Sequence, residues 1–492
     1  GADIFRCNMV GNESGRRMSK MVDIATAIAA HAAARPDAIA LNFDGNRIAW
    51  QTFQAEVGDW ASAFMAQTSG DKIALSFDNS AELAIAVCAA IRAGKCAQVL
   101  DPAWPSGIAD KVVSVLGPDL FLDTPPPQHS RPGPTECRPD IHRPFYTGFT
   151  SGSTGMPKGF RRSQHSWLES FRGDEQQFEF TADDVFVALG SLAHSLFMYA
   201  VIRGLYAGAE TVFFPQFRPD RALDRIQNSN GTVIYGVPTQ YDAIALEGER
   251  KERRLAGVRL VLSSGAKLSV PLRARLRRVF PNAEICEFFG TSEQSYVTVA
   301  RDGIAPEGSV GEAFPGVDLR ILDNHGQRAA VGEVGRVFVA SELLFAGYEF
   351  GESGSIQSDG DAISIGDVGY LDSDGNLFLT GRSDRMIVTS GKNVYPEEVE
   401  AVLSAYTGVQ NTAVLGVDDR RRGKRLVGVL CLAEDVNLQR RNLMVWCKGK
   451  LPQYKIPRSY FLCPDWPRTV SEKTDYPALC TLMAAGNLSE LL

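Results

Sequence analysis

The stretch Phe149-Thr150-Ser151-Gly152-Ser153-Thr154-Gly155-Met156-Pro157-Lys158-Gly159 combines glycines with four hydroxyl side chains and one lysine. The apolar run before it, residues 144–149, predicts a strand, and a helical pattern begins at Ser163. A loop of this composition between a strand and a helix leaves backbone N–H groups free, the hydroxyls add donors, and Lys158 adds a positive charge. These features predict a binding site for a polyphosphate.

The spacing of this stretch differs from that of the common P-loop, in which the lysine directly follows the second glycine of G-x4-G-K-[ST]. Here Gly152 and Gly155 are three residues apart, and Met156-Pro157 separates the second glycine from Lys158. A flexible Gly/Ser linker is the alternative, but linkers seldom end in a fixed Pro-Lys-Gly between two regular elements. The spacing therefore excludes a P-loop NTPase and favours another kind of phosphate loop.

The bulk properties indicate a globular protein of several structural units. The 492 residues suggest about three to four units. A net charge of -7 disfavours a general role on nucleic acid or membrane surfaces, and no apolar run approaches the roughly 18–20 residues that span a bilayer. The nine cysteines form no C-x-x-C pair, which predicts reduced thiols and a cytoplasmic location.

Apolar segments of strand and helix length alternate from residue 22 to residue 289, which indicates parallel sheets with right-handed crossovers. Helices are expected over 22–34, 50–65 and 81–93, and strands over 39–43, 72–77, 97–100, 185–189, 210–214, 232–236, 258–263 and 284–288. Residues 309–380 carry short β-type runs between dense turns. After Arg382 the pattern becomes strand, helix, strand, strand, helix, strand.

These patterns predict an α/β protein with two domains. A large N-terminal domain over residues 21–383 would hold mostly parallel sheets flanked by helices, together with a small β subdomain at about 309–380. A smaller, mobile α+β domain would follow over residues 384–492. Residues 1–20 are polar and glycine-rich, so we expect a disordered tail or an expression remnant there.

A second chemical block, Glu287-Phe288-Phe289-Gly290-Thr291-Ser292-Glu293, follows a predicted buried strand. The carboxyl ends of parallel strands face the crevice where ligands usually lie. The aromatic rings can stack on adenine, and the carboxylate of Glu293 is a hard oxygen ligand suited to Mg²⁺ that bridges phosphates. The structural alternative is that one or both phenylalanines belong to the core.

Six blocks in this order resemble those of the adenylate-forming superfamily, which comprises acyl- and aryl-CoA synthetases, peptide-synthetase adenylation domains and luciferases. The matching blocks are residues 149–159, 287–293, 366–372, 381–385, 387–400 and 467–476. The resemblance spans about residues 25–480 and is nearest to an acyl- or aryl-CoA synthetase. It implies ATP-dependent activation of a carboxylic acid as acyl-AMP, and then transfer to a thiol.

The resemblance assigns roles to residues in the later blocks. Asp367 would hold both ribose hydroxyls, since one carboxylate can accept from two vicinal OH groups, and Arg382 would also contact the ribose. Asp384 would be the hinge between the domains, and Gly391 would let the backbone approach a narrow pantetheine tunnel. The acids after Pro396 need only a helix-capping explanation.

Lys473 matches the lysine that, in this superfamily, reaches between the acid and the α-phosphate. A mobile cation there stabilises the negative charge that builds up between two anions. The family usually has glycine before this lysine, whereas this chain has Glu472. The resemblance thus implies a catalytic set made of four side chains: Lys473, Glu293, Lys158 and His194.

His194 and Ser195 lie where the superfamily lines its acid pocket. Amino-acid-activating members usually carry Phe-Asp there, so the absence of a fixed anion disfavours an α-amino acid. The alternative for His194 is a hydrogen-bonded, half-buried imidazole. The other pocket candidates are Tyr199, Tyr235, Gly236, Val237, Gly265 and Tyr296; Gly265 and Ala266 are also candidates to contact the nucleotide. Their apolar character predicts an uncharged acyl or aryl acid.

Malonate-type members resemble this chain around Val237-Pro238-Thr239 but place an arginine soon afterwards. Asp242 and Ala243 stand there instead, which argues against a dicarboxylate. No carrier domain follows Lys473, so we expect an external thiol, either CoA or the phosphopantetheine of a separate carrier protein. The basic turn of residues 420–425 could meet the 3′-phosphate of CoA or an acidic carrier protein, although a solvated turn is the simpler reading.

The expected cofactors and partners are therefore ATP, Mg²⁺, a small carboxylic acid and CoA, with the protein a monomer or homodimer. Two alternatives stay open at this point. One is a stand-alone enzyme that loads a carrier protein. The other, prompted by Glu472, is a non-catalytic nucleotide-binding protein. A luciferase-type oxygenase would need a special substrate, of which the sequence gives no sign.

Overall fold

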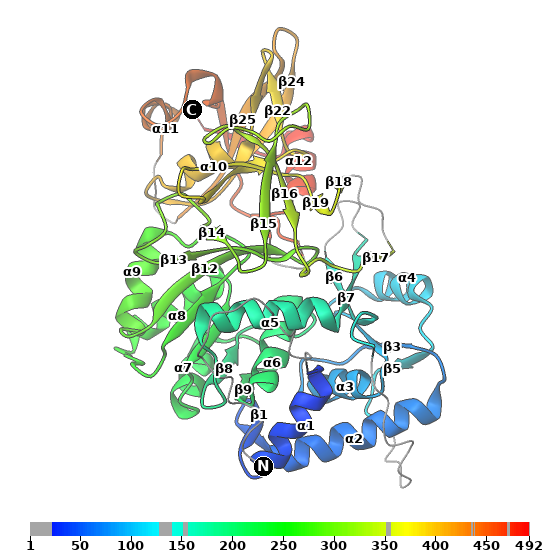
Figure 1. Cartoon of the computed structure of the whole chain (residues 1–492). Helices are drawn as coiled ribbons and strands as arrows, with labels where there is room; N and C mark the ends of the chain where they lie inside the picture. The colour runs from blue at the N-terminus through cyan, green and yellow to red at the C-terminus, as the bar shows by residue number, and fades with distance from the viewer. Residues whose placement is uncertain are drawn as a thin grey trace, which may run out of the picture.

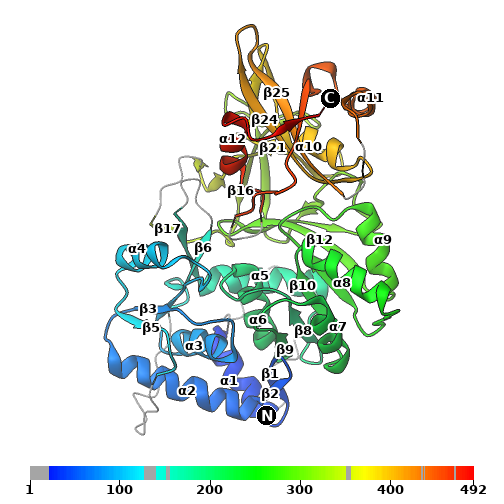
Figure 2. The same ribbon diagram turned by 180° about the vertical axis from the view of Figure 1, so that it is seen from behind.

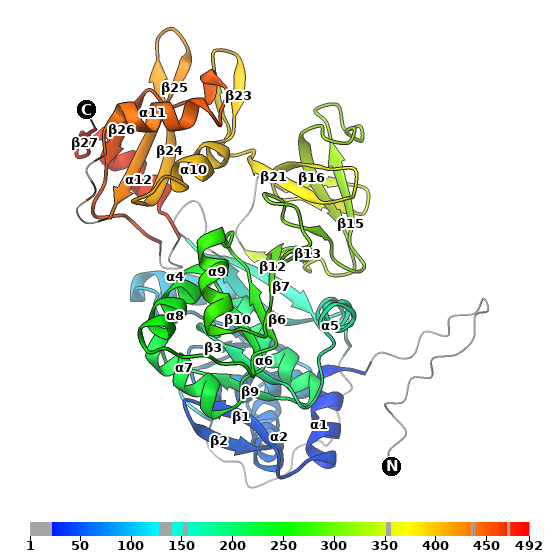
Figure 3. The same cartoon turned by 90° about the vertical axis from the view of Figure 1, so that its left-hand side faces the viewer.

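The computed structural model describes residues 22–126, 140–150, 156–350, 356–433, 436, 438–469 and 473–491. Four sheets build the protein, and Figure 1 shows two of them in a large lower part that carries the N-terminus. The other two stand above it, and the last of these carries the C-terminus (Figures 1 and 3). The large α/β part and the smaller C-terminal domain confirm the predicted fold class.

The largest sheet has nine strands in the order β14-β13-β12-β11-β10-β8-β9-β1-β2. Its strands are β1 (Ile39–Phe43), β2 (Asn46–Ala49), β8 (Val185–Ala188), β9 (Glu210–Phe213), β10 (Val233–Gly236), β11 (Leu260–Ser263), β12 (Glu284–Thr291), β13 (Ser295–Arg301) and β14 (Glu312–Ala313). The strands from β1 through β9, β8, β10 and β11 to β12 are parallel, as the alternation of elements predicted. Antiparallel strands close both edges.

Helices cover both faces of this sheet. They are α1 (Ile24–Ala34), α2 (Trp50–Gln67), α3 (Ala81–Arg92), α5 (Gln164–Phe178), α6 (Ser195–Ala207), α7 (Pro219–Asn228), α8 (Pro238–Arg250) and α9 (Val270–Val279). Gly236 lies against Tyr241 of α8, whereas its neighbour Tyr235 stacks near Phe186, which packs under Gly204 of α6. Because side chains alternate along a strand, α6 and α8 lie on opposite faces.

The second sheet has the order β17-β7-β6-β4-β3-β5. Its elements are β3 (Lys72–Leu75), β4 (Cys96–Val99), β5 (Leu120–Leu122), β6 (Pro144–Thr150), β7 (Lys158–Ser163) and β17 (Tyr348–Phe350), with α4 (Ser106–Leu116) beside them. β3, β4, β5 and β6 are parallel, and β7 returns antiparallel to β6. One core cluster joins this sheet to the nine-stranded one.

The expected strand–loop–helix at the phosphate loop is wrong in one respect. Lys158 begins the strand β7, and it pairs with Thr150 across a hairpin, so the loop connects two strands. The predicted helix follows only after β7, as α5, whose first turn is capped by the Ser163 hydroxyl. Residues 127–139, and residues 151–155 of the phosphate loop, lie outside the described part.

The third sheet contains β15 (Asp318–Leu322), β16 (Gly335–Ala340), β18 (Gln357–Asp359), β19 (Ala362–Ser364), β20 (Asp367–Leu371) and β21 (Leu377–Arg382). All of its pairings are antiparallel. The sheet falls within the stretch for which dense turns and short β-type runs predicted a β subdomain. Its strand β20 begins with Asp367, and its strand β21 ends at Arg382.

The fourth sheet forms the C-terminal unit in Figure 2. Its elements are β22 (Ile387–Thr389), β23 (Lys392–Val394), α10 (Pro396–Ser404), β24 (Val409–Asp419), β25 (Gly423–Leu432), α11 (Arg440–Lys448), β26 (Ser459–Leu462), α12 (Tyr476–Ala484) and β27 (Ser489–Glu490). The predicted order is extended by a hairpin strand at the start and by α12 and β27 at the end. The expected domain boundary near Asp384 stays a prediction; β22 begins three residues after it.

No helix among the described residues is long and apolar enough to cross a membrane.

Candidate active site

The β6–β7 hairpin brings Lys158 next to a tyrosine that the motif analysis did not single out. Lys158 Nζ lies 5.9 Å from the ring centroid of Tyr348, on β17, the strand that pairs with β7. The Tyr348 hydroxyl donates to Oε1 of Glu293 at 2.6 Å. Lys158 of the phosphate loop and Glu293, the carboxylate predicted to hold Mg²⁺, therefore both lie next to the side chain of Tyr348.

The carboxylate of Glu293 has the chemistry of a magnesium ligand at a phosphate site. The described residues contain no cluster of three or more His, Cys, Asp or Glu side chains that could hold a metal alone. Mg²⁺ at nucleotide sites usually takes one or two carboxylates, with phosphates and water as the remaining ligands. A single carboxylate next to the phosphate loop therefore meets the requirement.

Arg162 is a second residue that the sequence reasoning missed. It lies on β7 and is 3% exposed. Its guanidinium donates to the carbonyl of Ser292 at 3.1 Å and to that of Leu343 at 2.6 Å. Burial is the main cause that lowers the pKa of Arg162 to about 10, and the nearby Glu293 opposes the shift. Arg162 thus ties the phosphate-loop hairpin to the segment that carries Glu293.

The Glu287–Glu293 block does not follow a strand as expected, because β12 continues through Thr291. Within it, Phe288 is 8% exposed with its ring 4.5 Å from that of Tyr296, whereas Phe289 is half-buried. Gly290 packs against the Ser295 carbonyl, where an added Cβ would lie 2.2 Å from the oxygen. The hairpin to β13 therefore stays tight at Gly290.

Glu287 is engaged inside the protein. Its Oε2 accepts from the backbone N–H of Leu268 at 2.5 Å and from Arg273 at 3.2 Å. Burial raises the pKa of Glu287, and these two donors oppose the shift. The carboxylate therefore braces the loop after β11, which holds Gly265 and Ala266.

Asp367 is buried, 8% exposed, and its Oδ2 has no hydrogen-bond partner among the residues that the structure describes. Burial raises its pKa to about 6, and Arg382, whose Nη1 lies 3.9 Å from Oδ1, opposes that shift. A buried oxygen without a donor is costly unless a ligand supplies one. Two vicinal hydroxyls would do so. Arg382 also donates to the carbonyl of Ile365 and to Asp384, at 2.8 and 3.3 Å.

His194 is the residue directly before α6, which follows the parallel strand β8 of the nine-stranded sheet, and its side chain makes no capping hydrogen bond. Burial is the main cause that lowers its pKa; the Asp101 carboxylate opposes the shift, and the Lys473 ammonium adds to it. Figure 2 shows the segment before α12 descending to the boundary between the upper and lower parts.

Lys473 closes a short turn in which its backbone N–H donates to the Thr469 hydroxyl at 3.3 Å and its carbonyl accepts from the Thr469 N–H at 2.8 Å. Glu472, next to it, lies outside the described residues.

Gly391 lies in the turn between β22 and β23 with φ +74°, and an added Cβ would meet nothing within 4 Å among the described residues. The neighbouring Ser390 N–H donates to the Arg422 carbonyl at 3.0 Å, so the turn lies beside the basic turn of residues 420–425. Gly391 therefore faces space that no described residue fills, and Lys473 is exposed.

The residues proposed for the acid pocket fall into two groups. Those that are half-buried or exposed are His194, Ser195, Val237, Gly265 and Ala266. Those that are buried are Tyr199, Tyr235, Gly236 and Tyr296. Gly265, at φ +88°, faces Val237, whose Cγ1 would lie 3.7 Å from an added Cβ. The tyrosines were expected to line an open pocket, and the structure packs them in the core instead.

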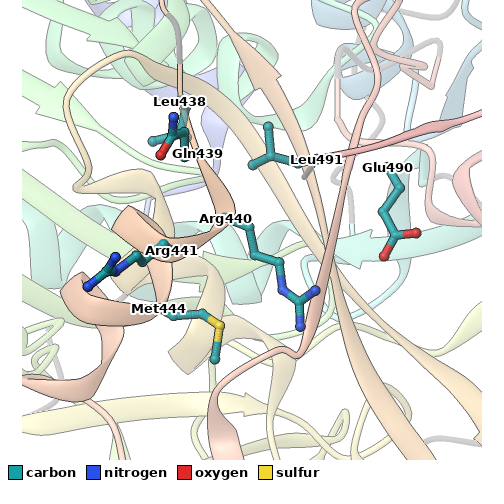
Figure 4. Close-up of a pocket in the computed structure, with 7 residues that line it drawn as sticks. All are labelled: Leu438, Gln439, Arg440, Arg441, Met444, Glu490 and Leu491. Atoms are coloured by element: carbon teal, nitrogen blue, oxygen red, sulfur yellow. The ribbon is translucent and has the colours of Figure 1, made fainter.

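An open hollow elsewhere contains none of these residues. It lies on the C-terminal domain between the start of α11 and β27, where Arg440, Met444 and Glu490 line it (Figure 4). It is separate from the residues that gather around Lys158, Asp367 and His194.

Comparison with known proteins agrees with the motifs. The family described as AMP-binding enzyme matches residues 28–132 and 120–349, and its C-terminal domain matches residues 398–473. The uncharacterized acyl-CoA ligase YhfT of Bacillus subtilis is 32% identical over 464 residues, which cover 89% of this chain and 94% of YhfT. The putative long chain fatty acid-CoA ligase VraA of Staphylococcus aureus is 27% identical, with 93% and 98% covered.

Among solved structures, the o-succinylbenzoate CoA synthetase MenE of Bacillus subtilis, in complex with the acyl-adenylate OSB-AMP, superposes with a TM-score of 0.83. It is 23% identical, and the match covers 92% of this chain and 97% of MenE, which supports the fold. The family match over most of the chain and the 32% identity to YhfT confirm the predicted superfamily: the chain belongs to the AMP-binding enzyme family.

Proposed function

We propose that this protein is an ATP-dependent carboxylic acid–CoA ligase. In the first step a carboxylate oxygen attacks the α-phosphorus of ATP, the bond to the β-phosphate bridging oxygen breaks, and pyrophosphate leaves. In the second step the thiolate of CoA attacks the acyl carbon, and AMP leaves with both electrons of the acyl–oxygen bond. The thiol proton passes to solvent. CoA-ligase relatives that match nearly the whole chain support this reaction.

One observation carries the first step: Lys158 Nζ lies 5.9 Å from the ring centroid of Tyr348, and the Tyr348 hydroxyl donates to Glu293 Oε1. Lys158 would bind phosphates there, and Glu293 would hold Mg²⁺, which would neutralise their charge. Lys473 would neutralise the charge that builds up between the acid and the α-phosphate. Asp367 and Arg382 would hold the ribose.

The second step needs a different arrangement of the domains. Since no described residue lies within 4 Å of an added Cβ at Gly391, we infer that the C-terminal domain rotates about Asp384 after adenylation and brings the Gly391 turn in. The basic turn of residues 420–425 would move with it, because Ser390 and Arg422 share a backbone hydrogen bond. That turn would then lie near the phosphates of CoA.

His194, Ser195 and Val237, the accessible residues proposed for the acid pocket, carry no fixed charge of their own to pair with an ammonium or a second carboxylate, which supports an uncharged acid. We further propose that the protein works in the cytoplasm, where ATP and CoA are available, as a monomer or homodimer.

ATP–pyrophosphate exchange with a panel of acids tests the adenylation step, and thioester formation with CoA tests the acceptor. Acid-dependent exchange and CoA thioester are the expected result. Thioester that forms only on added carrier-protein phosphopantetheine would replace CoA as the acceptor. Exchange with none of the acids, in protein that still binds ATP, would favour a non-catalytic nucleotide-binding protein.

A further inference from the structure

Three buried tyrosines, Tyr199, Tyr235 and Tyr296, occupy the inner part of the proposed acid pocket; we call them the tyrosine group. Their side chains are 7%, 0% and 3% exposed. They come from three elements, α6, β10 and β13. Tyr199 follows the half-buried Ser195 by one turn of α6, and Tyr235 lies two residues before the half-buried Val237. The tyrosine group would therefore bound the recess that Ser195 and Val237 line.

The tyrosine group lies between the nine-stranded sheet and the helices α5 and α6. The rings of Tyr199 and Tyr296 meet edge to face with centroids 5.6 Å apart. The hydroxyls of Tyr235 and Tyr296 lie 3.4 Å apart, within hydrogen-bond reach. On the sheet side, Tyr235 stacks on Phe186. The three side chains thus contact one another and leave their polar atoms paired.

An ion pair within the core fixes Tyr199. Its hydroxyl donates to Asp174 Oδ2 at 2.7 Å, and Arg203 Nε donates to Asp174 Oδ1, also at 2.7 Å. Asp174 and Arg203 are 0% and 1% exposed. The guanidinium in turn lies over the rings of Phe171 and Phe180, 5.3 and 4.9 Å from their centroids. Swinging Tyr199 aside would remove a donor from a buried carboxylate, which is costly.

Two phenylalanine rings pack against Tyr296. Phe314 stacks on it with centroids 4.5 Å apart and an interplanar angle of 11°, and Phe288 lies 4.5 Å away. Gly173 of α5 allows this approach, because a Cβ there would lie 2.3 Å from the Phe314 ring. Cores packed in this way leave little room for a side chain to withdraw.

We propose that the tyrosine group is the specificity-determining floor of the acid pocket and restricts the protein to short acyl chains. This inference rests on the proposed function, since it assigns the acid class of the same site. It sets the chain apart from relatives whose names state a long chain fatty acid or o-succinylbenzoate. Substrates of the size of acetate, propionate and butyrate would reach the floor, while octanoate and benzoate would collide with it.

The test compares adenylation of acetate, propionate, butyrate, hexanoate, octanoate and benzoate by the wild type and four variants. Tyr235→Ala and Tyr296→Leu enlarge the recess. Tyr235→Phe and Tyr296→Phe are matched controls, because they remove only the hydroxyl and keep the ring. We expect the ratio of kcat/KM for octanoate over acetate to rise about tenfold or more in the enlarged variants and to stay within about twofold in the phenylalanine variants.

Binding measurements with a series of analogues distinguish failure of this proposal from failure of the proposed function. Acyl-sulfamoyl-adenosine analogues of increasing chain length mimic the acyl-adenylate without turning over, and calorimetry on the wild type gives their affinities. Preference for the acetyl to butyryl analogues over the octanoyl one supports the floor, even where no acid supports exchange and the proposed function fails. Equal or tighter binding of the octanoyl analogue overturns the floor, even where the protein is an active ligase.

The acid preference of the enlarged variants gives a second test of the role of the tyrosine group. Folded enlarged variants, judged by thermal unfolding, whose acid preference stays that of the wild type would overturn the role of these residues. If both enlarged variants unfold, the affinities of the wild type for the acyl-sulfamoyl-adenosine analogues still test whether the tyrosine group limits chain length.

Discussion

Asp367 combines a buried position with a carboxylate oxygen that has no partner, so its folded-state pKa of about 6 lies above the value of about 3.9 in an unfolded chain. A raised acid pKa favours the folded state below about pH 4, and that contribution is lost as the pH rises through about 6. The protein thus accepts a cost in stability at neutral pH at a position that suits two ribose hydroxyls.

Asp367→Asn should therefore weaken ATP binding and stabilise the free protein. The amide cannot ionise, so the stability of the variant relative to the wild type should grow by about 1–3 kcal/mol between pH 4.5 and pH 7.5. ATP affinity should fall at least tenfold, because a charged acceptor is lost. Thermal unfolding and calorimetry measure the two effects. Asp374→Asn, on an exposed turn, is the control; a pH-independent difference for Asp367→Asn would contradict the assignment.

Lys473→Ala should separate the two half-reactions. Loss of the cation between acid and α-phosphate should lower acid-dependent pyrophosphate exchange by about 100-fold or more. Thioester formation from supplied acyl-AMP should stay within about threefold of the wild type. Lys448→Ala, an exposed lysine of the same domain, should change neither rate. Equal loss in both half-reactions would instead indicate a binding or folding defect.

The residues that the sequence could assign sit inside continuous motifs, as Lys158, Glu293 and Asp367 do. Tyr348 and Arg162 could not be assigned from their neighbours in the chain. Each becomes part of the site only because distant strands pair: β17 returns to β7, and Arg162 reaches the Ser292 carbonyl from β7. Tyr199, Tyr235 and Tyr296 stay predicted pocket residues, because whether such side chains line a pocket or fill it depends on packing that no local pattern encodes.

Among the elements, the phosphate-loop hairpin shows where periodicity is ambiguous. A short run such as Lys158–Ser163 can be a loop or a strand, and pairing with β6 makes it a strand. Long segments with clear periods, such as α3 and α10, were predicted well. The turn between β22 and β23 depends on its own residues. Ser390 and Gly391 both take positive φ, +50° and +74°, and glycine adopts such a φ without strain.

Gly391→Leu should leave adenylation within about twofold of the wild type and lower thioester formation at least tenfold. The side chain would meet open space in the arrangement seen here and would obstruct the thiol only when the turn enters the site. Gly326→Leu is the matched control, because Gly326 has φ +75° in an exposed turn with nothing within 4 Å of an added Cβ. Equal effects of both substitutions would show backbone strain alone.

At the scale of the molecule, alternation of strands and helices was sufficient to predict the α/β part and the separate C-terminal unit. It could not predict how the two are placed, because that depends on contacts across the boundary, such as the approach of Gly381 to Tyr395 and Glu397. The large part and the C-terminal unit have separate core clusters. Relative motion of the domains is the default expectation for such an interface.

Asp384→Pro should hold the protein in the arrangement that presents Lys473. Asp384 lies in the link between β21 and β22, and proline would fix its φ near -65° and so limit rotation there. Pyrophosphate exchange should persist within about threefold, while CoA thioester formation should fall at least tenfold, because the Gly391 turn could no longer enter. Asp384→Ala, which removes the contact to Arg382 but keeps the backbone free, is the control and should retain both half-reactions. Thioester formation at the wild-type rate by Asp384→Pro would place the rotation elsewhere in the link or exclude it, whereas loss of exchange in both variants would assign Asp384 to nucleotide binding through Arg382.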